Sequence, residues 1–126
     1  MRTGQMLVEV LLAIAVAALV LVGMAQLSTR SLTTSNFSRS KSQADVYAQE
    51  AVEMIRTERT TKGWSDFFTS YSCDTLDGTL TGGFTRNATC TKVSGIPEKV
   101  TVTVTVSWAE AGKTFNSTQT TELNQY

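Results

Sequence analysis

Residues 6–25 read MLVEVLLAIAVAALVLVGMA, and this stretch decides the fold of the first part of the chain. Glu9 is its one charged residue, and no side chain from Val10 to Ala25 is polar. A helix rises about 1.5 Å per residue, so a helix of this length spans roughly the 30 Å of a bilayer core. The stretch therefore predicts an apolar, membrane-length helix with a carboxylate near its start.

The carboxylate of Glu9 is costly in such a helix. Nine of the sixteen residues from 10 to 25 are Val, Leu or Ile. Together they favour membrane insertion by about 4 kcal/mol. A carboxylate costs roughly 3 kcal/mol at the bilayer centre and less near the end of a helix. Insertion is still favoured, and an intramembrane carboxylate usually has a partner and a role.

Three interpretations fit this start of the chain. In a cleaved secretory signal, Arg2 is the basic region and Gly23-Met24-Ala25 is the small-residue cleavage site before Gln26. In an ordinary signal anchor, Glu9 lies near the headgroups without a partner. The third interpretation is a prepilin, the precursor of a filament subunit, and it depends on a resemblance.

The stretch GQMLVEVLLAIA, residues 4–15, resembles the N-terminal motif of type IV pilins and type II secretion pseudopilins. In that family a short basic leader ends in Gly, a prepilin peptidase cuts after it and methylates the new amino terminus, and the fifth mature residue is Glu. The resemblance implies a leader at 1–4, cleavage between Gly4 and Gln5, and Glu9 as the assembly residue. Gln5 stands where the family usually has Phe, so its amine is either methylated or lost when the glutamine cyclises.

The resemblance also implies a role for Glu9 and a set of partners. Cleavage exposes a positive amine at Gln5, and Glu9 of a neighbouring subunit pairs with it, because buried charges are tolerated only when paired. The implied partners are other pilin subunits through their N-terminal helices, the prepilin peptidase, the inner-membrane assembly machinery, and the lipid bilayer before assembly. The implied location is a single pass through the cytoplasmic (inner) membrane, then an extracellular pilus or a periplasmic pseudopilus.

The basic residues after the apolar stretch favour the opposite orientation in the membrane. Arg30, Arg39 and Lys41 follow its outer end within about 20 residues, where the positive-inside rule counts charge. Only Arg2 and the initiating amine lie on the inner side. We give the leader motif more weight, because a very short N-terminal tail is oriented by other cues.

The middle of the chain predicts that the helix continues. Residues 28–43 are polar, rich in Ser and Thr and poor in helix formers, so a flexible linker is the alternative. An apolar stripe then follows at helical spacing and ends at Lys62-Gly63, a basic last turn with a glycine stop. The stripe comprises Ala44, Ala48, Ala51 and Ile55. We expect one helix from about residue 6 to 62, weakened at 28–43, with 5–27 as the transmembrane or filament-core part and 28–63 as an amphipathic continuation.

Residues 64–126 predict a globular head with antiparallel strands. Val100–Trp108 reads VTVTVTVSW, and this alternation is typical of a half-buried antiparallel strand. Residues 84–93 form a strand by composition, 109–113 a hairpin loop, and 114–123 a returning strand with Phe115 and Leu123 facing inward. The fold class is α+β, a long N-terminal helix packed against a small antiparallel sheet. The last two strands resemble those of minor pilins and minor pseudopilins.

Two further groups of residues belong to this head. The aromatic side chains between 64 and 71 favour packing beside the helix over an aromatic binding patch; they are Trp64, Phe67, Phe68 and Tyr71. Cys73 and Cys90 have 16 residues between them. Disulfides persist in exported domains, and closing this loop would stabilise the fold by about 3 kcal/mol. The alternative is two buried thiols.

Composition argues against most other functions. The 11 basic and 11 acidic residues balance, so no strong field recruits nucleic acid. There is no His, no Cys-x-x-Cys and no paired-carboxylate motif. We therefore expect no metal, cofactor or catalytic residues, and a structural subunit resembling a minor pilin. The competing class is a single-pass membrane-anchored or secreted extracytoplasmic binding domain, and an enzyme is a weaker competitor.

Overall fold

Helix α1 (Arg2–Lys62) is the longest element of the chain, at 61 residues. The computed structural model describes the backbone of residues 2–125 and the side chains of residues 4–125. The chain divides into two units, Met1–Phe37 and Ser38–Tyr126. The predicted helix is confirmed, including its end at Lys62, although it begins a few residues earlier than expected.

The polar stretch 28–43 does not interrupt α1. Thr29 Oγ1 donates a hydrogen bond of 3.2 Å to the carbonyl of Ala25, and Thr33 Oγ1 donates one of 3.0 Å to the carbonyl of Thr29. Such bonds to the preceding turn let a hydroxyl residue lie within a helix. A low intrinsic propensity at 28–43 therefore produces no break, and the linker alternative is wrong.

The end of α1 is set by Gly63, whose φ of 77° is the left-handed conformation that favours glycine. Its amide donates a bond of 3.1 Å to the carbonyl of Arg59 and so satisfies one of the last carbonyls of the helix. A short helix, α2 (Trp64–Ser70), follows at once. The sequence did not predict it, because seven residues rich in aromatic side chains are too few to carry a helical signal of their own.

The second unit contains a four-stranded antiparallel sheet in the order β1-β2-β3-β4. Its strands are β1 (Gly78–Leu80), β2 (Phe84–Val93), β3 (Lys99–Glu110) and β4 (Lys113–Asn124), and a 3-10 turn, η1 (Cys73–Leu76), precedes β1. The predicted strand 84–93 is confirmed, and the other two are longer than expected. Ala111 and Gly112, with φ of 50° and 76°, form a tight two-residue turn in place of the longer loop predicted at 109–113.

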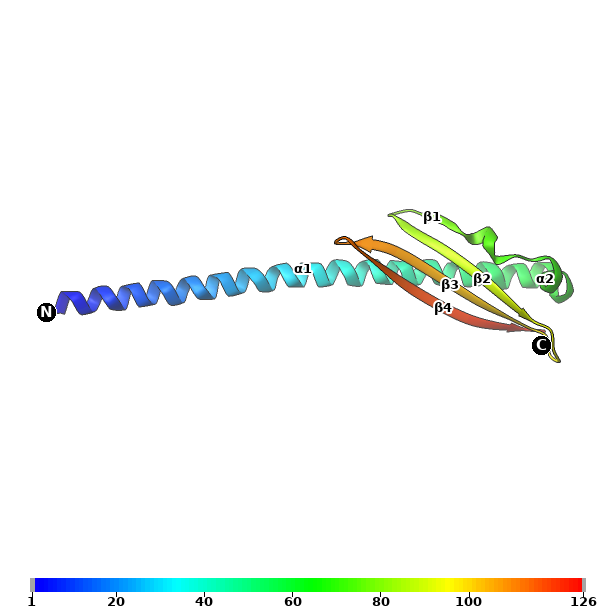
Figure 1. Ribbon diagram of the computed structural model, residues 1–126, viewed down its shortest axis with the longest axis horizontal. Helices are drawn as coiled ribbons and strands as arrows, with labels where there is room; N and C mark the ends of the chain where they lie inside the picture. The colour runs from blue at the N-terminus through cyan, green and yellow to red at the C-terminus, as the bar shows by residue number, and fades with distance from the viewer. Residues whose placement is uncertain (1, 126) are drawn as a thin grey trace. The chain divides into compact units, whose positions relative to one another are not determined.

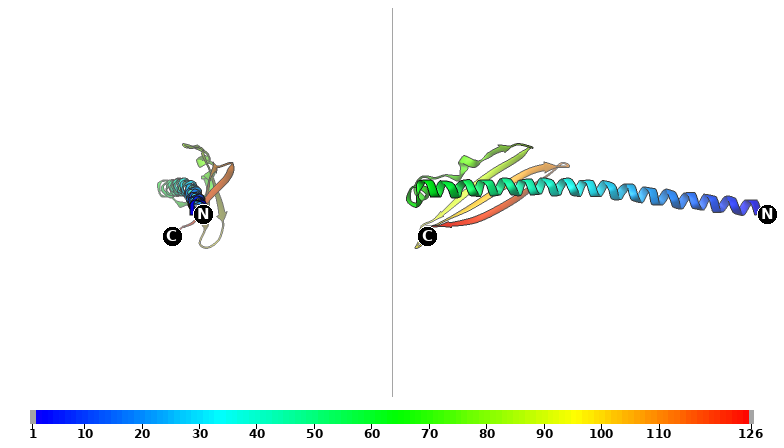
Figure 2. Two further views of the ribbon diagram at one scale, coloured as in Figure 1. Left: turned by 90° about the vertical axis from the view of Figure 1, so that its left-hand side faces the viewer. Right: turned by 180° about the vertical axis from the view of Figure 1, so that it is seen from behind.

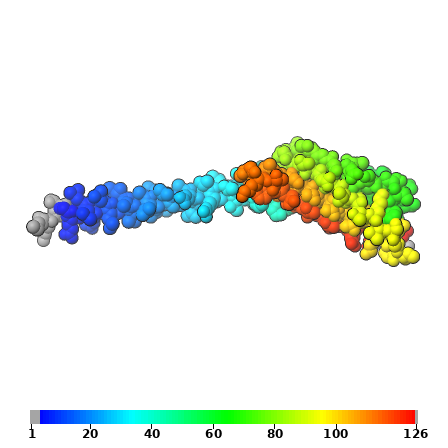
Figure 3. Space-filling model, viewed as in Figure 1, coloured from blue at the N-terminus to red at the C-terminus, as the bar shows by residue number. Residues whose placement is uncertain are grey.

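The core of the second unit lies between the sheet and the end of α1. The strands run side by side over this part of the helix (Figure 1), and from behind the helix lies in front of them (Figure 2). Val104 is fully buried, as are the other three alternating valines of β3. The helix contributes the predicted stripe, Ala44, Ala48, Ala51 and Ile55, each at 0% exposure. In the space-filling view the strands hide much of this stretch of α1 (Figure 3). The α+β class is thus confirmed, with helix and sheet as two layers.

The aromatic group at 64–71 packs rather than forming an open patch. Phe67 and Tyr71 are buried, and their rings stack with centroids 5.0 Å apart. Trp64 is half-buried, and its indole nitrogen donates a bond of 2.7 Å to Glu98. The packing interpretation is therefore confirmed.

Candidate functional site: the apolar helix and its carboxylate

The first unit carries a continuous apolar surface. An 18-residue window of α1 has a mean hydropathy of 2.8, and none of it is buried. The large apolar side chains between residues 6 and 27 are 50–74% exposed. A core helix of a soluble protein would be covered by the rest of its fold, so this helix needs another apolar environment. By length and composition it can cross a membrane.

Glu9 lies exposed on this apolar helix. Within the part of the chain that the structure describes, its carboxylate has no hydrogen bond and no ion pair. Gln5 precedes it by four residues and so lies on the same helix face, about 6 Å away along the axis. A carboxylate without a partner among these residues is costly in a membrane and available to a cation from outside.

The predicted processing site lies in the first turns of α1. Met1, at the start of the predicted leader 1–4, is outside the described residues. A side chain at Gly4 would meet open space, since no atom lies within 4 Å of the position that a Cβ would take there. The packing of the described residues therefore does not require glycine at this position.

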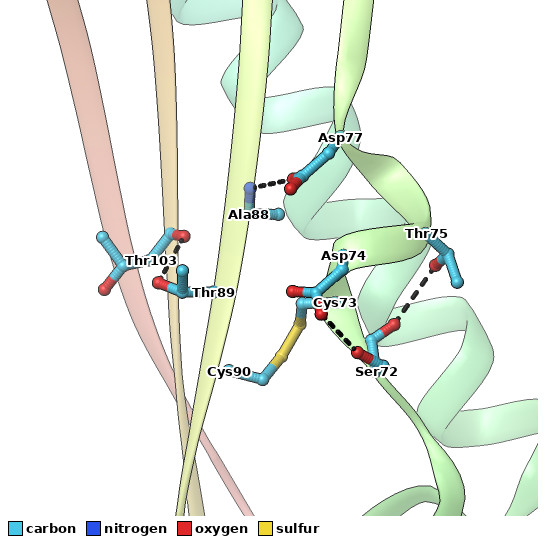
Figure 4. The surroundings of a disulfide bond; sticks show 9 residues. All are labelled: Ser72, Cys73, Asp74, Thr75, Asp77, Ala88, Thr89, Cys90 and Thr103. Atoms are coloured by element: carbon cyan, nitrogen blue, oxygen red, sulfur yellow. Dashed lines mark hydrogen bonds between the residues drawn. A yellow bond between two sulfur atoms is a disulfide. The ribbon is translucent and has the colours of Figure 1, made fainter.

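The two cysteines are bonded to each other, with their Cα atoms 5.6 Å apart. The disulfide joins η1 to β2 (Figure 4), so the predicted bond is confirmed over the alternative of two thiols. Beside it, Asp77 Oδ1 accepts a bond of 2.6 Å from the amide of Ala88, and Arg86 Nε donates one of 2.8 Å to the carbonyl of Leu76. These bonds and the disulfide hold the segment 73–80 against β2.

Polar contacts between α1 and β4 were missed from the sequence. Asp45 accepts a hydrogen bond from the hydroxyl of Ser117, which is buried. Arg59 donates to the carbonyl of Asn124 at the end of β4. The sequence does contain one indication of such a contact. Asp45 directly follows Ala44, the first residue of the apolar stripe, and an acid so close to the buried face is expected to have a partner. The partner itself could not be found without the fold.

The described residues contain no group of three or more His, Cys, Asp or Glu side chains placed to hold a metal ion. No protein-family model matches the chain, and no curated protein and no solved structure shows significant similarity to it. A functional assignment therefore depends on the N-terminal motif, the exposed apolar helix and the architecture of helix and sheet.

Proposed function

We propose that the chain is a structural subunit of the type IV pilin class, most similar to a minor pilin. In this proposal it is made as an inner-membrane precursor and shortened by hydrolysis of the Gly4–Gln5 peptide bond. It then assembles through residues 5–27 into an extracellular pilus or a periplasmic pseudopilus. The observation that carries the proposal is an exposed apolar helix whose carboxylate, five residues after a glycine, has no partner among the described residues.

In this proposal the helix needs two apolar environments in turn. Before assembly the bilayer covers its side chains at little cost beyond that of Glu9. In a filament the N-terminal helices of neighbouring copies replace the lipid, and Glu9 finds the amino terminus of another copy. A signal that is cleaved after Ala25 would give the carboxylate no role in the mature protein.

The small disulfide-bonded second unit supports the same proposal. A subunit that leaves the membrane and enters an oxidising compartment benefits from a covalent link across a thin, two-layered fold. The architecture, a long N-terminal helix packed on a small antiparallel sheet, agrees with what the resemblance to pilins implies.

The mature N-terminus tests the proposal. We expect the full chain, expressed with a prepilin peptidase, to lose four residues and start at Gln5, as read by mass spectrometry. Gly4→Val should block this cleavage, because a peptidase that reads a short leader needs a small residue at the scissile bond. Gly23→Val is the matched control, since both glycines lie in α1 and have open space within 4 Å of where a Cβ would be. It should be cleaved like the wild type.

Other termini would point to the competing class. A start at Gln26 indicates a secreted domain, and an intact Met1 indicates an uncleaved membrane anchor with an extracytoplasmic binding domain. Equal processing of wild type and Gly4→Val would also contradict the proposal, because the leader motif would then not be what the peptidase reads.

A further inference from the structure

The second unit has an acidic groove beside α1. The groove has a volume of about 730 Å³ and lies between residues 50–62 of α1 and residues 70–76. Three carboxylates line it, those of Glu50, Glu53 and Glu58, against the single amine of Lys62. Met54 also lines it and is 41% exposed, so the groove combines apolar surface with negative charge.

One of these carboxylates has no partner among the residues that the structure describes. Glu53 pairs with Arg56 at 2.7 Å, and Glu58 pairs with Lys62 at 3.2 Å. Glu50 is exposed and forms no ion pair or hydrogen bond with any residue that the structure describes. The groove therefore has an unmatched negative charge at its N-terminal end, next to the exposed side chain of Met54.

The complementary charge lies on the same helix. Arg39 is exposed and likewise has no partner among the described residues. It precedes Glu50 by 11 residues, which is about three turns, so both lie on one stripe of α1. The stripe continues through Val46, at 57% exposure, and faces away from the buried Ala48. Arg39 cannot reach Glu50 of its own chain, because three turns of helix separate them by roughly 16 Å.

We propose that the acidic groove of one copy binds Arg39 of a second copy, which lies parallel and is shifted by about three helical turns. A guanidinium suits this groove, because it can bind a carboxylate through two parallel hydrogen bonds while its stem covers Met54. The same shift places Val46 of the second copy beside Thr57 of the first. In-register packing would instead place Glu50 against Glu50, and like charges across an interface are unfavourable.

The contact joins two different positions of the same stripe, since Arg39 of one copy meets Glu50 of the other. The shift leaves Arg39 of the first copy and the groove of the second copy without a partner inside the pair. This inference deepens the proposed function and rests on it. The shift of about 16 Å exceeds the roughly 6 Å between Gln5 and Glu9 along the helix. The groove therefore contacts a different neighbour from the one that pairs with Glu9.

Cysteine cross-linking of full-length chains in membranes tests the contact whether or not filaments form. One tagged copy carries Val46→Cys and a second carries Thr57→Cys, both exposed positions on the stripe. We expect a disulfide-linked pair of the two tags. As the control, Thr60→Cys replaces Thr57→Cys; it is also exposed but lies about 60° around α1 and almost a turn further along. It should give about tenfold less product. Equal product from both pairs would overturn the proposed register.

Charge exchange tests the chemistry. In the cross-linking pair, Arg39→Glu or Glu50→Arg should reduce the product by about tenfold or more, because each places like charges together. A chain with both substitutions should regain it, since the pair is then reversed but intact. Lys41→Glu and Asp66→Arg make the same changes of charge at exposed positions outside the stripe and the groove, and should leave the product near the wild-type level.

The outcomes separate this inference from the proposed function. Normal processing and filaments with no effect of Arg39→Glu would overturn the groove contact and leave the pilin proposal intact. An unprocessed chain that still cross-links between Val46→Cys and Thr57→Cys would contradict the pilin proposal alone. Failure of the double exchange to restore the product would show that the substitutions act on folding, and the groove contact would be rejected.

Discussion

Glu9 gives the sharpest prediction, because its substitution has opposite effects in the membrane and in a filament. Within the described residues the carboxylate has no hydrogen bond and no ion pair, so Glu9→Ala removes no polar interaction from the folded subunit. In the bilayer it removes a cost of at most about 3 kcal/mol. The variant should therefore be present in the membrane at a normal or higher level and be cleaved after Gly4.

In the proposed filament the same substitution would leave the amino terminus of a neighbouring copy buried without a partner. Breaking a buried pair by removing one member costs roughly 3 to 5 kcal/mol, which corresponds to a loss of more than about a hundredfold in each subunit contact. Glu9→Ala should therefore be nearly absent from sheared filaments. The assay is quantitative immunoblotting of sheared filaments and of membranes from the same cells.

Two controls show which property of the carboxylate matters. Glu9→Gln keeps the shape but not the charge, and should be depleted like Glu9→Ala. Adding Ala13→Glu to Glu9→Ala restores a carboxylate one turn further along the same face of α1. This chain should also fail to assemble, because the amino terminus is about 6 Å out of register. Normal incorporation of Glu9→Ala into filaments would refute the pairing argument, even if the protein proved to be a pilin.

The remaining predictions concern the second unit. Replacing both Cys73 and Cys90 by Ser should lower the Tm of the full chain in detergent by about 10 °C or more, because the disulfide contributes about 3 kcal/mol, and an unchanged Tm would contradict this. Val104→Ala removes a fully buried side chain and should cost about 2 to 3 kcal/mol in urea unfolding, whereas Thr103→Ala on the solvent side should stay within about 0.5 kcal/mol. Gly63→Ala forces a left-handed conformation on alanine and should cost about 1 to 2 kcal/mol in the same measurement; a stabilised variant would rule out this account of the end of α1.

Elements with a long periodic pattern could be predicted from the sequence. The apolar stretch at 6–25 and the alternation at 100–108 each repeat one rule over many residues, so local chemistry is sufficient. The end of α1 could also be predicted from neighbouring residues alone. Lys62 belongs to a basic last turn, and Gly63 is the residue type that accepts a positive φ. The continuation of the helix through 28–43 was harder, because its Ser and Thr residues also favour loops, and the structure resolves the choice as helix.

Short elements could not be predicted. Helix α2 and strand β1 have seven and three residues, too few for either period to show. Strand β1 contains Gly78, a poor strand former, and pairs with β2 because the disulfide and the bonds from Asp77 and Arg86 hold the segment there. Tertiary contacts outweigh propensity when an element is this short.

The sequence by itself determined the candidate processing site and its carboxylate, because Gly4, Gln5 and Glu9 lie within six residues on one helix and need no fold to bring them together. The tertiary structure alone decided which distant groups meet. Cys73 and Cys90 bond because η1 packs beside β2, and the acidic groove exists because residues 70–76 return to the side of α1 that carries Glu50. Sequence spacing determines which residues are neighbours along one helix. Which residues of the helix and the sheet become neighbours depends on how the chain turns back, and packing of the whole core determines those turns.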